Sequence, residues 1–157
     1  MHTRFVDDPR LTAVGLLVEV YGGLIRRLDA VHAANGLTGT DFDVLIRLVR
    51  SPAKRLRMTD LATQTALSTS GITRIVDRLE SRSLVARQPC MDDRRSSWAS
   101  LTDSGQHLLD AHLPGLVHAI DEAFVGLLTT EQLDGFLDTL GTMRDALHPG
   151  ATAGADI

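Results

Sequence analysis

The sequence has few cysteines, lysines and aromatic residues, and it has no long apolar run. Its one cysteine, Cys90, cannot form an intramolecular disulfide, and no group of cysteines is available to hold a structural metal. No window approaches the roughly 18–20 apolar residues of a transmembrane helix, and Asp7, Asp8 and Pro9 interrupt the segment where a leader peptide would lie. We therefore expect a soluble, cytoplasmic protein with no metal, no other cofactor and no contact with a membrane.

The signatures of common enzyme classes are missing as well. The sequence has no Gly-rich phosphate loop, no His-Glu-x-x-His zinc motif and no Gly-x-Ser-x-Gly nucleophile turn. His107, His112 and His118 are spaced by five and six residues, whereas two metal ligands on one helical face need a spacing of about four. We therefore expect no catalytic residue and no zinc site.

What is present suits a single folded domain. The chain has 157 residues, and independent domains commonly contain about 100–200. Its hydrophobic content of 43% excludes wholesale disorder, which needs low hydrophobicity and a large net charge. We therefore expect residues 1–157 to form one domain.

The formal net charge of −4 conceals a strong division along the chain. Residues 47–95 contain eleven basic and five acidic side chains and carry +6, whereas the flanks contain five basic and fifteen acidic side chains and carry −10. A basic segment between acidic ones indicates that the middle of the chain binds a polyanion and that the ends serve another purpose. The alternative is a charged face that contacts only solvent.

Apolar spacing and capping residues predict six helices and two strands. The helices are expected at 11–34, at 41–50 after a cap at Thr40, at 60–65 after a cap at Thr59, at 69–83 after a cap at Ser68, from a cap at Thr102 or Asp103 to residue 127 or 128, and at 130–147. The strands, at 84–88 and 96–101, flank a charged turn, and residues 148–157 are expected to form a flexible tail.

Residues 59–82 have the layout of a helix-turn-helix, whose second helix enters the major groove of DNA. One face of that helix is apolar, and the other carries hydroxyl groups and arginines. Hydroxyls at a helix N-terminus suit phosphate oxygens, and arginines one turn apart reach guanine edges or phosphates. The predicted DNA-contacting residues are Ser68, Thr69, Ser70, Thr73, Arg74 and Arg78. A surface helix with a solvated face is the alternative.

The predicted hairpin adds a wing to this helix-turn-helix. Arg94 and Arg95 lie at its tip beside Asp92 and Asp93, and a narrow minor groove attracts inserted arginines. The two carboxylates lower the local charge, so we expect them to orient the arginines rather than to bind phosphate. The alternative is a solvent-exposed turn stabilised by Asp–Arg pairs. Cys90, close to these arginines, is a candidate redox sensor, although exposed single cysteines usually have no such role.

Three segments together match a known pattern. Residues 56–62 and 67–80 have the residue order of two helix-turn-helix segments, and residues 93–102 contain Asp-x-Arg, a strand and then Leu-Thr. These segments resemble the helix-turn-helix and wing of MarR-type transcription regulators, and the resemblance covers about residues 10–147. Ser83 departs from the pattern, because such sequences often have glycine there, which adopts helix-end geometry more easily.

The resemblance implies a homodimer that binds a pseudo-palindromic operator in double-stranded DNA. The subunits would pair through helices at 10–36 and 103–147, and residues 38–102 would form the DNA-binding lobe. The flanking helices carry more apolar surface than one small lobe can cover, which also favours pairing. Packing of these helices within one chain is the alternative, and the two are compatible.

Many members of the family respond to a small molecule held between the dimer helices and the DNA-binding lobe. The polar residues near that predicted junction are Tyr21, His32, Asp43, Arg47 and His112. Lone histidines in helices are more often ordinary core or surface residues.

We expect a dimeric, sequence-specific DNA-binding transcriptional regulator, a repressor that a small-molecule effector relieves. The alternative is a winged helix used as a protein-interaction or dimerisation module without specific DNA binding. The basic segment and the arginine-tipped wing count against that alternative, because a protein-binding wing needs neither.

Overall fold

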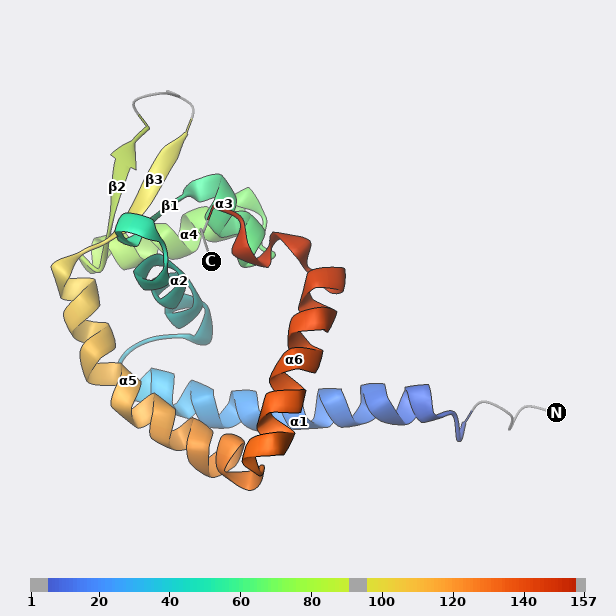
Figure 1. The fold of residues 1–157 in the computed structure, drawn as a ribbon. Coiled ribbons are helices and arrows are strands. Elements are labelled where there is room, and N and C mark those ends of the chain that lie inside the picture. Colours follow the sequence, from blue (N-terminus) through green and yellow to red (C-terminus); the bar gives the residue numbers. More distant parts are fainter. Residues whose placement is uncertain (1–5, 91–95, 155–157) are drawn as a thin grey trace.

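The structure, a computed structural model, describes residues 6–90 and 96–154. The elements of that part are α1 (Pro9–Ala34), α2 (Gly39–Arg50), β1 (Arg55–Arg57), α3 (Met58–Gln64), α4 (Thr69–Ser81), β2 (Val85–Pro89), β3 (Ser97–Leu101), α5 (Asp103–Ala123) and α6 (Thr130–Leu147), with 3₁₀ turns at Pro52–Lys54, Val125–Leu127 and Pro149–Thr152. The predicted fold, mainly helical with a helix-turn-helix and a short β-hairpin wing, is confirmed (Figure 1).

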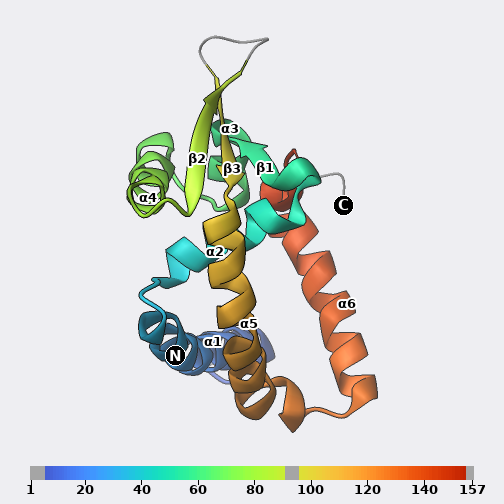
Figure 2. The same ribbon diagram turned by 90° about the vertical axis from the view of Figure 1, so that its left-hand side faces the viewer.

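The three strands form an antiparallel sheet in the order β1-β3-β2, and its β2–β3 hairpin projects from the top of the molecule (Figures 1 and 2). Leu56, Val85 and Ala99 are buried on the inner face of this sheet. Sequence patterning does not predict β1, because three residues are too few to show an alternating pattern. β1 exists through its pairing with β3, which joins Arg57 to Trp98.

The core lies in the lobe made by α2, α3, α4 and the sheet. Leu48, Leu61, Ile72 and Leu79 are all inaccessible to solvent there. The first turn of α5 is seated against this lobe at Gly105, where an added Cβ atom would come within 2.2 Å of the Leu84 carbonyl oxygen. Only glycine permits this approach, so the position of α5 relative to the sheet depends on it.

Two helix starts differ from the sequence predictions. The cap of α2 is Thr38 rather than Thr40: its hydroxyl accepts from the Asp41 backbone N–H, and the Asp41 carboxylate accepts from the Thr38 backbone N–H. This reciprocal capping box satisfies two amide groups, which a lone cap at Thr40 would not. α3 starts at Met58 without a side-chain cap, because β1 leads directly into it and Thr59 lies inside the helix.

The ends of α4 and α5 also differ. α4 ends at Ser81, and Ser83 adopts the left-handed conformation with φ of 59°. The departure from glycine noted in the sequence therefore falls at a position where glycine is favoured. α5 ends at Ala123, four residues before the earliest predicted end, because Phe124 leaves the helical conformation and packs edge-to-face on Phe136 of α6 with ring centroids 5.6 Å apart.

Two long arms extend from the lobe. α5 runs from the sheet to α1, and α6 returns toward α3, so that the C-terminal segment ends beside the helix-turn-helix (Figure 1). The sequence predicts a flexible tail at residues 148–157, yet Pro149–Thr152 forms a 3₁₀ turn. The backbone carbonyl of Ala153 accepts a 2.7 Å hydrogen bond from Gln64 Nε2, and His148 Nε2 lies 2.9 Å from the Thr63 carbonyl oxygen. These contacts give the segment a defined position as far as Gly154.

Candidate nucleic-acid interface

α4, the second helix of the helix-turn-helix, presents two different faces. Its buried side is made of four aliphatic residues, Ile72, Ile75, Val76 and Leu79. Ser68 caps the helix by accepting from the Gly71 backbone N–H at 3.1 Å. The opposite side carries Ser68, Thr69, Ser70 and Arg74, all exposed, with Thr73 half-buried beside them. The hydroxyl and arginine face that the sequence predicts is therefore open to a ligand.

The two arginines of α4 differ in their surroundings. Arg74 is exposed, and no side-chain partner for it lies among the described residues. Arg78 donates to Asp41 Oδ1 from Nε at 3.0 Å and from Nη2 at 2.5 Å. Arg78 is thus engaged by α2, although its side chain is still 45% exposed. Sequence periodicity places both arginines on one face and cannot distinguish them.

The Asp41 carboxylate that holds Arg78 is 1% exposed. Burial alone raises the pKa of a carboxyl, but the hydrogen bonds from Arg78 and from the backbone and hydroxyl of Thr38 outweigh it and lower the pKa of Asp41. Asp41 is therefore a carboxylate at neutral pH, and it attaches α4 to the first turn of α2.

Besides Arg78, which joins α4 to α2, a second arginine joins α4 to the sheet. Arg87 of β2 pairs with Asp77 at 2.7 Å and donates to the Thr73 carbonyl oxygen at 3.1 Å. Its backbone N–H donates to Glu80 at 3.0 Å. Sequence reasoning assigns no role to these residues. The sequence shows only that Arg87 lies in a strand after a helix that carries acidic residues. It does not show which acidic residue Arg87 pairs with.

The structure describes the wing as far as Cys90 and Ser96, and its last strand pair is Pro89–Ser97. Asp93, Arg94 and Arg95, the predicted wing contacts, lie outside the described residues. Cys90 is 4% exposed and its backbone N–H donates to the Ser96 carbonyl oxygen at 3.1 Å. The expectation of an exposed cysteine is therefore wrong, and the buried thiol lacks the access a redox sensor needs.

The two histidines predicted near an effector site meet in the interior. His32 Nδ1 of α1 lies 2.9 Å from His112 Nε2 of α5, and the His32 ring stacks on Phe42 of α2 with centroids 4.8 Å apart. Burial lowers the pKa of both histidines, and the neighbouring His112 lowers that of His32 further, while Asp29 acts in the opposite direction. Both rings are therefore neutral near pH 7, and together with Phe42 they join α1 and α5 to α2 of the lobe.

Four of the five predicted effector-site residues line one or both of two cavities. Tyr21, His32 and Asp43 line an open cavity of about 520 Å³ between α1, α2 and α5. Arg47 lines a smaller cavity of about 240 Å³ beside the C-terminal segment, and it donates to Asp43 at 2.9 Å and to the Ala151 carbonyl oxygen at 3.2 Å. His112 is buried behind the first cavity. Asp43 borders both cavities.

Among residues 6–90 and 96–154, no group of three or more His, Cys, Asp or Glu side chains is placed to hold a metal ion. In the same part of the chain, no helix has the length and apolar character needed to cross a bilayer.

The fold and the exposed face of α4 define a winged helix-turn-helix protein. The family model of the MarR family matches residues 35–96. The HTH-type transcriptional regulator YkoM of Bacillus subtilis (strain 168) is 35% identical over 101 residues, which are 62% of each chain. The structure of AbsC, a MarR family transcriptional regulator from Streptomyces coelicolor, is 32% identical with a TM-score of 0.84, covering 92% of this chain and 98% of AbsC.

Sco3205, another MarR family regulator from Streptomyces coelicolor, was solved in complex with DNA. It is 29% identical with a TM-score of 0.84, covering 90% of this chain and 93% of Sco3205. The chain belongs to the MarR family. The relatives are transcriptional regulators and not enzymes.

Proposed function

We propose that this protein is a homodimeric, sequence-specific regulator that binds a pseudo-palindromic operator in double-stranded DNA and represses transcription until a small molecule relieves it. The observation that carries the proposal is the exposed hydroxyl and arginine face of α4 beside the β2–β3 hairpin. Such a protein works on chromosomal DNA, so we place it in the cytoplasm and assign it no catalysis.

In this proposal the N-terminal half of α4 enters the major groove. Ser68, Thr69, Ser70 and Thr73 bind phosphates and base edges, and Arg74 reads a guanine. Arg78 approaches the same groove while it is held by Asp41, so its main part is to fix the angle of the helix. Asp93, Arg94 and Arg95 are assigned to the minor groove, with the aspartate orienting the arginines.

Dimerisation through residues 10–36 and 103–147 is supported by surface that one chain leaves uncovered. His32 is the one buried residue of α1, and none of the residues of α6, all of which are described, is buried. Leu137 is 57% exposed and Leu140 is 36% exposed. An isolated chain would expose a long apolar stripe to water, whereas a second copy would cover it.

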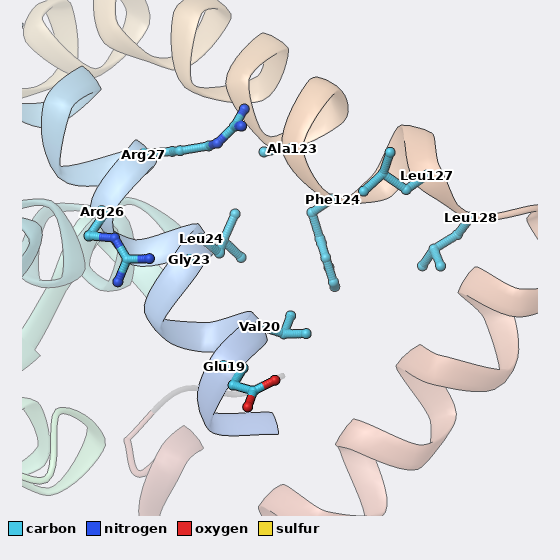
Figure 3. A pocket seen from close by; sticks show the side chains of 10 residues that line it. All are labelled: Glu19, Val20, Gly23, Leu24, Arg26, Arg27, Ala123, Phe124, Leu127 and Leu128. Atoms are coloured by element: carbon cyan, nitrogen blue, oxygen red, sulfur yellow. The ribbon is translucent and has the colours of Figure 1, made fainter. Parts of the chain in front are cut away.

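Figure 3 shows part of this uncovered surface, a cavity of about 620 Å³ between α1 and the end of α5. Phe124 points into the space between the helices, and Val20 and Leu24 of α1 line the side facing it. A Cβ atom added at Gly23 would meet nothing within 4 Å, so no described element packs on that glycine. A helix of a second subunit can approach there closely.

The proposed effector site is the cavity lined by Tyr21, His32 and Asp43. Its position supports the assignment, because the flanking helices α1 and α5 and the lobe helix α2 all border it. A ligand that changes the spacing of these helices changes the position of α4, and it relieves repression only if it binds the DNA-free arrangement more tightly.

The direct test is a gel shift with DNA from upstream of the gene itself, followed by selection of bound sites from random DNA. Binding is expected to weaken steeply with salt, and selected sites are expected to have two half-sites about 34 Å apart. Absence of binding to any fragment at low salt would leave the protein-interaction module as the better explanation.

The dimer has its own test by sedimentation. The protein is expected to sediment at twice its 17.0 kDa chain mass, and Leu137→Glu is expected to shift it toward the monomer because it puts a charge into the apolar stripe. A wild-type monomer at every concentration would contradict the proposal. Thr142→Glu is the control: Thr142 is an exposed residue of α6 outside the apolar groove that Leu140 and Met143 line, so this variant measures how the helix itself tolerates an added charge.

A further inference from the structure

The outer face of the sheet holds two arginines against one indole ring. The guanidinium carbon of Arg55 lies 4.7 Å from the centroid of the Trp98 ring, and that of Arg57 lies 5.3 Å from it. Arg55 and Arg57 are two residues apart on β1 and therefore point to the same side of the sheet. We refer to Arg55, Arg57 and Trp98 as the stacked face.

The charge of the stacked face is not neutralised within the described protein. Three other arginines of the lobe have carboxylate partners: Arg47 pairs with Asp43, Arg78 with Asp41 and Arg87 with Asp77. Neither arginine of the stacked face forms an ion pair with a carboxylate in residues 6–90 and 96–154. Holding two like charges together without a counter-charge costs free energy, and a bound anion would remove that cost.

Stacking leaves these arginines suited to phosphate. A guanidinium that lies on an aromatic ring keeps its N–H groups free at its edge, and these groups match a phosphate bidentately. The ring also restricts the side chains before any ligand binds, so less conformational entropy is lost on binding. Arg55 is exposed and Arg57 is half-buried, so both remain accessible.

The position of the stacked face indicates which phosphates it meets. Trp98 pairs with Gln88 on one side and with Arg57 on the other, one residue pair away from Pro89–Ser97, the last strand pair of the hairpin. Arg57 is also followed directly by α3, the first helix of the helix-turn-helix. β1 is thus the edge strand beside β3, on the side of the sheet away from β2 and α4 (Figure 2).

We infer that the stacked face is a second contact to the DNA backbone, in which Arg55 and Arg57 bind phosphates that flank the groove entered by the wing. This inference rests on the proposed DNA-binding function. It assigns the charge of these two arginines to the DNA backbone, where it adds affinity and salt dependence without base preference. Trp98 positions the two arginines and does not itself contact DNA.

The test compares salt dependence of operator binding for wild type, R55A/R57A, R55K/R57K and W98L. R55A/R57A is expected to reduce the slope of log K against log salt by about 0.9 for each phosphate that the variant no longer binds, that is by up to about 1.8. Its base preference in a site selection is expected to match wild type. R55K/R57K keeps both charges and is expected to keep most of the slope, and W98L is expected to weaken binding with a smaller change of slope.

Ethylation interference identifies the phosphates themselves. Wild type is expected to show interference at flanking phosphates that R55A/R57A no longer shows, while the signals inside the half-sites persist. An unchanged slope and an unchanged interference pattern in folded R55A/R57A would overturn the inference and leave the proposed function intact. If the wild-type protein binds no DNA, the proposed function and this inference are both refuted. Should R55A/R57A fail to fold, R57Q alone tests the same point with an expected slope change of about 0.9.

Discussion

Arg78 of α4 forms an ion pair with Asp41 at the start of α2. Asp41 is buried, with 1% of its surface exposed. The same carboxylate accepts the backbone N–H of Thr38 at 3.0 Å and so completes the cap of α2. One buried group therefore fixes both the beginning of α2 and the orientation of α4. An arginine that the sequence places on the DNA-facing side of a helix has a structural function as well.

Arg78→Ala is expected to lower the free energy of unfolding by about 1–3 kcal/mol, because it leaves a buried carboxylate without its charged partner. The measurement is urea unfolding followed by circular dichroism. Arg74→Ala, on the same helix but exposed, is the matched control and is expected to change stability by less than about 0.5 kcal/mol. In a double-mutant cycle with Asp41→Asn, strictly additive effects would show that the pair contributes nothing.

Arg74→Ala is expected to weaken operator binding by about 1–3 kcal/mol and to relax the preference at one base of each half-site. Arg95→Ala is expected to weaken binding across all sequences, because a minor-groove arginine responds mainly to groove width and charge. Binding titrations on the operator and on single-base variants separate the two effects. Equal losses that do not depend on sequence in both variants would rule out base readout by Arg74.

The stability of the protein is expected to fall as the pH drops below about 6.5, the ordinary pKa of histidine. Burial lowers the pKa of His32 and His112 in the folded state, so the unfolded chain binds more protons in this range and acid favours it. Each unit of depression costs about 1.4 kcal/mol once the pH is below the folded value. Stability at pH 7.5 and above is expected to retain this contribution in full.

Urea midpoints between pH 7.5 and 5 measure this dependence. His112→Gln is expected to flatten it, and His107→Gln, an exposed histidine on the same helix, is expected to leave it unchanged. A pH profile for His112→Gln identical to that of wild type would show that the pair does not titrate as described.

Ser83→Gly is expected to raise the free energy of unfolding by about 0.5 kcal/mol. The left-handed conformation costs a residue with a side chain roughly 1–2 kcal/mol, while glycine loses about 0.4–1 kcal/mol through greater freedom of the unfolded chain. Ser83 contributes its carbonyl to a 2.7 Å hydrogen bond from Thr102, which glycine preserves. Ser81→Gly, two residues earlier and inside α4, is expected to destabilise instead. Two changes of the same sign would refute the conformational explanation.

Local sequence signals predict the elements of this fold and the outward face of α4. The buried residues Ile72, Ile75, Val76 and Leu79 recur at helical spacing, and Ser68 has the geometry of a cap, so neighbouring residues suffice to find them. The left-handed backbone conformation at Ser83 can also be predicted locally, because it lies at the end of a helix where glycine is usual. Signals of this kind extend over one turn of helix, and they fail where two candidates lie within two residues, as at Thr38 and Thr40.

Contacts between distant residues are beyond such signals. Arg78 and Asp41 are separated by 37 positions, and His32 and His112 by 80. Nothing near Arg78 in the sequence indicates that it is paired while Arg74 is not. The stacking of Arg55 and Arg57 on Trp98 likewise follows from strand register, which the sequence does not display for a strand of three residues.

The C-terminal segment, residues 148–154, attaches the end of the chain to α3 of the lobe. From the sheet, the chain passes through α5 and α6 and returns to α3, where Gln64 holds the Ala153 carbonyl and an added Cβ at Gly150 would lie 2.4 Å from Thr63. The DNA-reading lobe is therefore attached at two points far apart in sequence. A rotation of the lobe about the start of α5 must stretch or release the second attachment. The contacts of His148, Gly150 and Ala153, as well as α5, therefore set the resting separation of the two α4 helices in a dimer.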